Sequence, residues 1–381
     1  MIDLLEKIVY NNSKTKTEVW NLKILVVFTG GTIGSTISGG YAVPDTDKRY
    51  KLISMYRENA ENYGDCGTEE KTEFEMETPY QELSENNTCV QISELASYLN
   101  EKIKLCGEDN GLYDGIIITH GTDTLQYTAA ALGYMFSDAS IPIVLVSSNY
   151  VLDDVKANGL INFAYAVKFI RGKYGAGVFV SYYNTGGHAV IHRGTRLMEH
   201  IAYSDDVYSV KDSEYGHFND GLFVKRIEET RASDEFFKST QKCSEIRRNF
   251  FKKNDVGNAF ADICVIKPFP GMRYGYVPDG IKAVLHMTYH SGTICSKSPD
   301  ITEFAKDAEK RSIPIYIIGA GDSVDYDSVR VYREIGFETL PVAALPAMLI
   351  KLWLSCIMFS DRHEISRFML DDIAGDINLN I

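Results

Sequence analysis

The stretch that decides the fold reads Lys23-Ile-Leu-Val-Val-Phe-Thr-Gly-Gly-Thr-Ile-Gly-Ser35, an apolar β-rich run that passes directly into paired glycines and threonines. A second stretch repeats this arrangement as Asp114-Gly-Ile-Ile-Ile-Thr-His-Gly-Thr-Asp-Thr124. Runs that are apolar along their whole length are typical of parallel strands buried on both faces. Because such sheets bind ligands at the carboxyl ends of their strands, both turns are expected at a binding edge.

Short β-rich runs alternate with longer helical segments along the rest of the chain. This alternation predicts an α/β fold whose main sheet is doubly wound and mostly parallel. The β-rich runs are 23–28, 115–119, 142–147, 177–183, 263–267, 281–286 and 314–318. The helical segments are 126–136, 159–169, 301–311 and 343–359.

The alternation of β-rich runs and helical segments stops after about Lys211 and starts again at Asp262. We therefore predict a larger N-terminal domain over 1–212, a linker over 213–258 and a smaller C-terminal α/β domain over 259–381. A basic cluster in the linker is interpreted as a solvated surface. It comprises Lys238, Lys242, Arg247, Arg248, Lys252 and Lys253. A second polar stretch, Tyr50–Thr78, is interpreted as an insertion or flap.

Composition limits the partners and the compartment. In 381 residues, 39 Lys and Arg against 52 Asp and Glu give a net charge of −13, so the molecule repels phosphate backbones and anionic lipid. Nucleic acid and membrane are therefore not expected as partners. The longest apolar stretch, 342–359, is broken by Pro346 and Lys351 and predicts a buried helix. Seven cysteines without a C-x-x-C pair, and no export signal in the first residues, favour the cytoplasm.

The two turns carry groups suited to acyl chemistry. Paired glycines let the backbone approach a substrate, and Thr32 offers a hydroxyl beside N–H groups that could hold an oxyanion. A plain strand-to-loop turn is the alternative, whereas the G-x-G-x-x-G and Walker phosphate patterns are missing. In the second turn, Thr122, Asp123 and Thr124 place a carboxylate between two hydroxyls. Asp123 could hold an ammonium group, although helix capping explains part of this run.

The pair TGGTIG and DGIIITHGTDT resembles the L-asparaginase and glutaminase family of the bacterial, threonine-nucleophile kind. The similarity continues through 141–149, 153–163, 264–272 and 283–293, so that about 23–360 is covered. The resemblance implies a two-domain α/β fold and a small amino-acid substrate, asparagine, with no cofactor. It also implies a homodimer or homotetramer whose site is closed by a neighbouring subunit.

The resemblance also implies a reaction and its catalytic residues. Thr32 lies where the family has its nucleophile, and Tyr41 lies in the loop where the family has the tyrosine that activates it. Thr122 matches the second threonine, which assists proton transfer, and Asp123 matches the aspartate that binds the α-amino group. The implied route is attack on the side-chain amide of L-asparagine, loss of ammonia, and release of L-aspartate from an acyl-enzyme by water.

Substrate binding is implied for three more residues. The segment Leu83-Ser84-Glu85-Asn86 resembles the family segment whose serine holds the α-carboxylate, which assigns Ser84 and its neighbour Glu85 to the site. Backbone amides at Gly31 and near Thr122 are the expected oxyanion donors.

One position departs from the family pattern. Counted from Arg193-Gly194, the family's lysine beside the second threonine falls on Glu199, which reverses the expected charge. The carboxylate itself, His192 or His200 could accept a proton there, and Lys156 is a conceivable replacement cation. Two alternatives to asparagine hydrolysis therefore stay open. One is action on another amide, such as glutamine, a peptide or a conjugate; the other is a catalytically weak amino-acid-binding protein.

No metal site is expected. His188 and His192, and likewise His286 and His290, have a spacing that suits a helix, but they lie in β or loop contexts. Thr293 occupies a position where many family members have an asparagine, which leaves the side-chain preference open.

Overall fold

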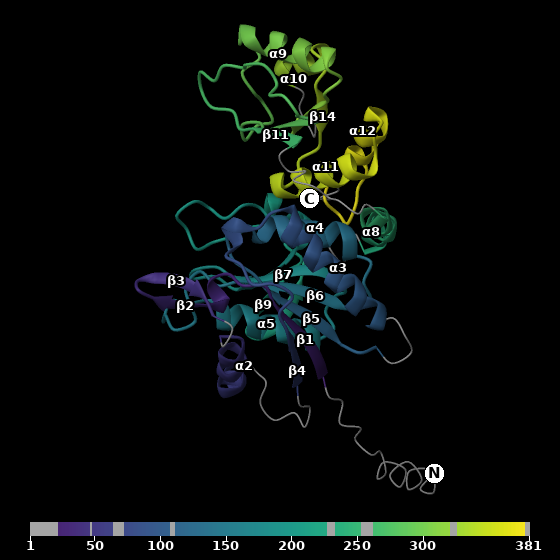
Figure 1. Cartoon of the computed structure of the whole chain (residues 1–381). Coiled ribbons are helices and arrows are strands. Elements are labelled where there is room, and N and C mark those ends of the chain that lie inside the picture. The colour runs from purple at the N-terminus through teal and green to yellow at the C-terminus, as the bar shows by residue number, and fades with distance from the viewer. Residues whose placement is uncertain are drawn as a thin grey trace, which may run out of the picture.

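The structure is a computed structural model that describes residues 22–45, 48–63, 72–106, 111–226, 233–252, 262–320 and 326–377. It contains a large sheet with helices on both faces and a smaller sheet at the other end of the molecule, with helices between them (Figure 1). No helix among these residues has both the length and the apolar character needed to cross a membrane.

The larger sheet has eight strands in the order β10-β9-β8-β7-β6-β5-β1-β4. Five neighbouring strands are parallel. These are β1 (Leu22–Phe28), β4 (Thr72–Glu77), β5 (Gly115–Thr119), β6 (Pro142–Val146) and β7 (Gly177–Tyr183). The sheet continues antiparallel through β8 (Ala189–Arg193), β9 (Gly216–Asn219) and β10 (Leu222–Lys225).

Alternate side chains of the central strands feed two hydrophobic cores. Leu25, Val27 and Ile116 face helices α3 (Cys89–Cys106) and α4 (Leu125–Phe136). Ile24 and Ile117 face α2 (Lys48–Asn59) and α5 (Gly159–Arg171) on the opposite side. Burial on both faces explains why these strands are apolar at every position, and the doubly wound, mostly parallel sheet is confirmed.

The smaller sheet is parallel, in the order β11-β12-β13-β14. Its strands are β11 (Ile263–Ile266), β12 (Ala283–His286), β13 (Ile315–Ile318) and β14 (Glu338–Leu340). The helices that accompany it are α9 (Pro299–Lys310) and α10 (Asp327–Glu334). Two further helices follow, α11 (Leu345–Met358) and α12 (Arg362–Leu370). In Figure 1, α11 lies between the two sheets and α12 lies to one side of the smaller sheet. The α11 side chains join the same hydrophobic core as α4, so the two halves share one core.

The predicted linker 213–258 is more ordered than a linker. It begins with β9 and β10, which extend the larger sheet, and continues with α7 (Ser233–Thr240) and α8 (Cys243–Lys252). The basic cluster that α7 and α8 carry is not wholly solvated, because Arg247 donates hydrogen bonds of 2.7 and 3.1 Å to Asp138 and Lys242 pairs with Asp371. Lys253 lies outside the described residues.

The predicted flap, 50–78, contributes to the larger sheet. It contains most of α2, a 3-10 turn over Ala60–Tyr63, and the edge strand β4, while 64–71 lie outside the described residues. β4 carries Glu73, Glu75 and Glu77 on alternate positions, as suits an edge strand with one solvated side. Its polar composition is why the sequence gives no apolar signal for it.

The C-terminal segment is anchored by a buried ion pair. Lys351 of α11 lies 2.7 Å from Asp376, and both side chains are fully buried. The hydroxyl of Tyr134 on α4 donates a second hydrogen bond of 2.7 Å to Asp376. Thr195 and Arg196, in a 3-10 turn over Gly194–Arg196, donate to the carbonyls of Ala374 and Gly375, each at 2.8 Å. The end of the described chain thus ties α4, α11 and the residues after β8 together.

Candidate active site

The first turn leaves the sheet at the carboxyl end of β1. Thr29 holds it to the end of β5, because its hydroxyl donates to the Thr119 carbonyl at 2.7 Å. Gly31 N–H donates to the Glu82 carbonyl at 3.0 Å, and a short 3-10 turn over Thr32–Gly34 follows. Gly30 and Gly31 have φ angles of +106° and +73°, which side chains other than glycine rarely adopt.

Three sequence segments meet at Gly121. A Cβ added to Gly31 would lie 2.3 Å from the Gly121 nitrogen, and a Cβ added to Gly121 would lie 2.3 Å from the Ser84 hydroxyl oxygen. Both approaches are closer than any real Cβ contact, so glycine is required on each side. The residues that follow or lie beside these contacts are Thr32, Ser84 and Thr122. The structure therefore brings the first turn, the Ser84 segment and the second turn to one point at the edge of the sheet.

The hydrogen bonds of the second turn do not involve the Thr122 hydroxyl or the Asp123 carboxylate. Thr124 donates to the Ser84 carbonyl at 2.8 Å, and Gln126 donates to the Asp123 carbonyl at 2.9 Å. α4 has Thr124 as its N-cap residue but no side-chain capping bond, so helix capping does not account for Asp123. Within the described part of the chain, no hydrogen bond or ion pair engages the hydroxyls of Thr32 and Thr122 or the carboxylate of Asp123.

His120 holds the second turn in place through hydrogen bonds from its buried ring. Its side chain is fully buried, with Nδ1 2.8 Å from the Gly121 carbonyl and Nε2 2.9 Å from the Thr128 hydroxyl and 3.2 Å from the Asn87 side-chain amide. Burial lowers the pKa of His120 to about 4, so the ring is neutral near pH 7. A neutral ring donates from Nδ1 to the carbonyl and accepts at Nε2. His120 therefore links the second turn, α4 and the Ser84 segment. Sequence analysis did not predict this role, because its only sign was the position of His120 within the second motif.

Glu199 lies beside the first turn of α4, the helix that follows the second turn. The Glu199 carboxylate accepts a hydrogen bond of 3.0 Å from the Tyr127 hydroxyl. Burial, with the Glu199 charge in addition, raises the pKa of Tyr127. The position predicted to replace the family's lysine is thus adjacent to the helix that carries the second turn, and Tyr127 is a partner that sequence reasoning missed.

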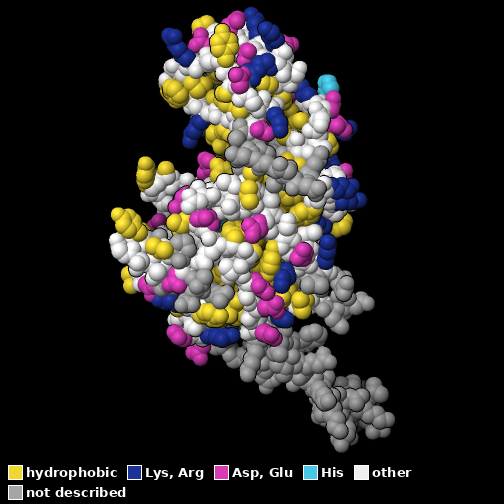
Figure 2. Space-filling view, viewed as in Figure 1, with side chains coloured by type: hydrophobic (Ala, Val, Ile, Leu, Met, Phe, Trp, Pro, Cys, Tyr) yellow, Lys and Arg dark blue, Asp and Glu magenta, His cyan; other side chains and the backbone are white. Residues whose placement is uncertain are grey.

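Tyr41, the predicted activating tyrosine, is largely exposed to solvent. It lies on the hairpin formed by β2 (Ser35–Ser38) and β3 (Tyr41–Pro44), and 77% of its surface is exposed. Ile37 and Val43 of the same hairpin are also exposed, and hydrophobic side chains stand out in Figure 2 at the edge where Figure 1 places β2 and β3. The structure therefore holds this hairpin open to solvent.

The structure also shows the surroundings of three other residues that the sequence analysis singled out. Glu85 is exposed on a 3-10 turn over Ser84–Asn86. Lys156 is exposed and its ammonium lies 5.8 Å from the centre of the Tyr150 ring. In the smaller domain, the Thr293 hydroxyl lies 3.0 Å from that of Ser291.

The histidines of the two spaced pairs have other neighbours. No group of three or more potential ligands that could hold a metal ion occurs among the described residues. His286 is buried and its Nε2 lies 2.8 Å from the Tyr274 hydroxyl, whereas His188 lies against His217 with ring centres 5.6 Å apart.

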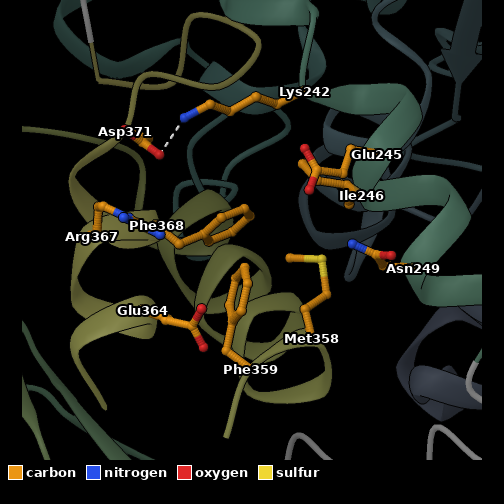
Figure 3. A pocket seen from close by; sticks show the side chains of 10 residues that line it. All are labelled: Lys242, Glu245, Ile246, Asn249, Met358, Phe359, Glu364, Arg367, Phe368 and Asp371. Carbon is orange, nitrogen blue, oxygen red and sulfur yellow. Dashed lines mark hydrogen bonds and ion pairs between the residues drawn. The ribbon is translucent and has the colours of Figure 1, made fainter. Parts of the chain in front are cut away.

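A cavity of about 400 Å³ lies elsewhere, between α8 and α12 (Figure 3). Ile246, Phe359 and Phe368 line its apolar part, and the ion pair of Lys242 with Asp371 spans one end. It contains none of the residues predicted for catalysis or substrate binding.

The fold is that of an amidohydrolase, and two threonine-bearing turns meet at the carboxyl edge of its doubly wound sheet. The chain belongs to the asparaginase family: the family model "Asparaginase, N-terminal" matches residues 23–221.

Relatives and solved structures agree with this family. The chain is 24% identical over 99% of its length to a glutamyl-tRNA(Gln) amidotransferase subunit from Metallosphaera sedula, of which 82% is covered. It is 30% identical to the L-asparaginase of Thermococcus kodakarensis over 51% of this chain and 55% of that protein. The solved structure of a thermostable L-asparaginase from the same organism matches with a TM-score of 0.69 at 22% identity, covering 93% of this chain and 99% of the other. L-asparaginase I of Vibrio cholerae matches with a TM-score of 0.69 at 18% identity, covering 94% and 99%.

Proposed function

We propose that this chain hydrolyses the side-chain amide of L-asparagine to L-aspartate and ammonia through an acyl-enzyme on Thr32. One observation carries the proposal. The contacts of Gly31 and Ser84 with Gly121 bring two threonine-bearing turns, far apart in the sequence, to one edge of the sheet. The hydroxyls and the carboxylate there have no partner within the described residues, and so they are available to a ligand.

Each part of the amino acid has a complement in this arrangement. The Asp123 carboxylate receives the α-ammonium group, and the Ser84 turn receives the α-carboxylate. The Thr32 oxygen attacks the amide carbon while backbone N–H groups of the glycine turn stabilise the oxyanion. The hydroxyl proton passes, with assistance from Thr122, to the departing nitrogen, which leaves as ammonia. Water then cleaves the ester, releases aspartate and restores the threonine.

Ammonia release from L-asparagine and L-glutamine tests this function. We expect wild-type protein to release ammonia from asparagine and Thr32→Ala to lose at least about a thousandfold in kcat/KM. Thr302→Ala is the matched control, because Thr302 is exposed on α9 in the other domain and its loss leaves the rate unchanged. Undiminished release by Thr32→Ala would end the nucleophile assignment. Tight binding of asparagine without ammonia release would instead select the amino-acid-binding alternative.

A second candidate is supply of amide nitrogen to a larger acceptor. It is supported by the name of the relative that aligns with 99% of this chain, which belongs to an amidotransferase. The open hairpin around Tyr41 leaves room for an acceptor larger than a free amino acid. Ammonia release from glutamine or a peptide amide, with none from free asparagine, would favour this function.

We also propose a cytoplasmic homodimer or homotetramer. The cytoplasm is supported by the scattered cysteines and by a structural match, with a TM-score of 0.60 at 19% identity, to a probable cytoplasmic L-asparaginase of Campylobacter jejuni. Light scattering of the purified protein determines the oligomeric state.

A further inference from the structure

Two helix faces and the end of α11 line the cavity between α8 and α12. On each helix the lining residues recur at a spacing of three or four positions, which places them on one face. They are Glu245, Ile246 and Asn249 on α8 and Glu364, Arg367 and Phe368 on α12. The volume of about 400 Å³ lies within the roughly 300–1,000 Å³ that is usual for pockets that bind small molecules. The cavity is therefore large enough for one small molecule.

An apolar surface forms the inner part of the cavity. Ile246 and Phe368 are buried, and Met358 and Phe359 are half-buried. The Phe359 and Phe368 rings pack against each other with centroids 5.6 Å apart, and Figure 3 shows Met358 beside the Phe359 ring. Aromatic rings and a flexible thioether offer contact area to an apolar group of a ligand. This part of the cavity therefore favours an aromatic or branched aliphatic group.

The charged groups at the rim of the cavity differ in whether they already have a partner. The Lys242 ammonium pairs with the Asp371 carboxylate across one end of the cavity (Figure 3). Glu245, Glu364 and Arg367 are exposed, and within the described part of the chain no hydrogen bond or ion pair engages their charged groups. Two carboxylates and one guanidinium are therefore available to a ligand.

Glu364 and Arg367 are three residues apart on α12, so their side chains are neighbours on the helix surface. Figure 3 shows both on the α12 side of the cavity, next to the two phenylalanine rings. A guanidinium binds a carboxylate through paired hydrogen bonds, and a carboxylate binds an ammonium group. An α-amino acid carries both of these groups on one carbon atom. A simple carboxylic acid would be repelled by the two glutamates, and a simple amine would leave the Arg367 charge without a partner.

We propose that this cavity binds an α-amino acid with a large apolar side chain, of which phenylalanine is the model, at a site separate from the candidate active site. Arg367 binds the α-carboxylate, and Glu364 binds the α-ammonium group. The apolar side chain of the ligand occupies the inner part, against Phe359, Phe368 and Ile246. The inference does not depend on the proposed function, because the cavity contains none of the residues assigned to catalysis or substrate binding.

Isothermal titration calorimetry of L-phenylalanine with the full chain tests the proposal. We expect a dissociation constant of about 1 mM or tighter. L-alanine keeps both charged groups but lacks the ring, and it should bind at least about tenfold more weakly. Asp123→Asn should bind L-phenylalanine as wild type does, because Asp123 lies outside the cavity. Loss of L-phenylalanine binding in Asp123→Asn would place the ligand in the candidate active site and overturn the inference.

Two substitutions at the rim, each measured with a truncated ligand by saturation-transfer NMR, assign the charged contacts. Arg367→Gln should weaken L-phenylalanine binding about tenfold but should not weaken binding of 2-phenylethylamine, which has no carboxylate. Glu364→Gln should weaken L-phenylalanine binding to a similar degree but should not weaken binding of 3-phenylpropionate, which has no ammonium group. Arg248→Gln and Glu309→Gln are the matched controls, because both residues are exposed and lie outside the cavity.

Wild-type protein provides a second measurement in case a rim variant does not fold. L-phenylalanine should bind more tightly than 2-phenylethylamine and than 3-phenylpropionate, since it alone engages both charged groups. Tighter binding of the amine or of the acid would overturn the inference in favour of a ligand with one charge. Absence of L-phenylalanine binding at about 10 mM, or unchanged L-phenylalanine binding in both rim variants, would also overturn it.

Discussion

The Tyr127 hydroxyl donates a hydrogen bond of 3.0 Å to the carboxylate of Glu199. Tyr127 lies in the first turn of α4, directly after the Thr122–Thr124 turn, so this bond holds a carboxylate beside the start of that helix. A lysine at position 199 would place a positive charge there instead. A single substitution at position 199 therefore reverses the charge beside the first turn of α4.

Glu199→Lys should raise the rate of amide hydrolysis. A cation near Thr122 favours the deprotonated hydroxyl and stabilises negative charge in the transition state, and we expect a gain of about tenfold in kcat/KM for asparagine. Tyr127 can accept a hydrogen bond from the ammonium group, so the fold tolerates the change. Glu199→Gln keeps the size and removes the charge, and should give a smaller gain. Equal rates for all three proteins would show that residue 199 does not influence the reaction.

Apolar composition explains which elements were predictable. β5 and β7 occupy 115–119 and 177–183, as predicted, because strands buried on both faces leave an uninterrupted apolar signal. β4 gave no such signal, since an edge strand tolerates glutamates on alternate positions. β9 and β10 are short antiparallel strands at the far edge of the sheet. Because they contain no long apolar run, this part of the sequence was predicted to be a linker.

The sequence predicted the parts of the candidate site that are neighbours in the chain or that follow the ends of adjacent parallel strands. One turn contains Thr122, Asp123 and Thr124. It was expected near Thr32 because both turns follow the carboxyl ends of predicted parallel strands, which lie at one edge of a sheet. The bond between Tyr127 and Glu199 depends on how the segment after β8 packs on α4, which spacing does not encode. The exposure of Tyr41 likewise depends on the hairpin's tertiary contacts.

Gly31→Ala should abolish activity and destabilise the fold. The added Cβ would collide with the backbone of Gly121, and the φ of +73° is unfavourable for alanine. We expect a loss of about 2–4 kcal/mol in the free energy of unfolding and at least a hundredfold in kcat/KM. Gly39→Ala separates the two causes, because Gly39 has a φ of +59° but nothing within 4 Å of its Cβ position. Urea unfolding should show a loss of about 1 kcal/mol for Gly39→Ala. Similar losses in both variants would contradict the close contact between the two turns.

Stability should fall as the pH drops from about 6.5 toward 4. Burial lowers the pKa of His120 to about 4 and that of His192 to about 3, whereas an unfolded histidine titrates near 6.5. Because the unfolded chain takes up these protons first, each histidine costs about 2 kcal/mol of stability between pH 6.5 and pH 5. Urea unfolding at several pH values measures this slope. His120→Gln should flatten it while lowering stability at pH 7, and the exposed His363→Gln should leave it unchanged.

Asp372 should act in the opposite direction over a similar range. Burial, with the charge of Asp376 in addition, raises the pKa of Asp372 to about 6, although Lys351 opposes the shift. The folded protein therefore favours the neutral acid, so this group destabilises the fold progressively as the pH rises from about 4 to 6. Asp372→Asn should stabilise the protein by about 1–2 kcal/mol at pH 7, after allowance for partial exposure, and by nothing at pH 4.

Two variants of the same segment distinguish this effect from a general tolerance of substitutions. Asp371→Asn removes a partly exposed pair with Lys242 and should cost less than about 1 kcal/mol at pH 7. Lys351→Met leaves Asp376 charged and buried without its cation, and should cost about 3–5 kcal/mol. Since Tyr134 of α4 also bonds to Asp376, Lys351→Met should lower ammonia release by displacing α4, which begins directly after the second turn. A stabilising Lys351→Met, or an Asp372→Asn whose gain is equal at pH 4 and pH 7, would show that the charges of this cluster do not set its energetics.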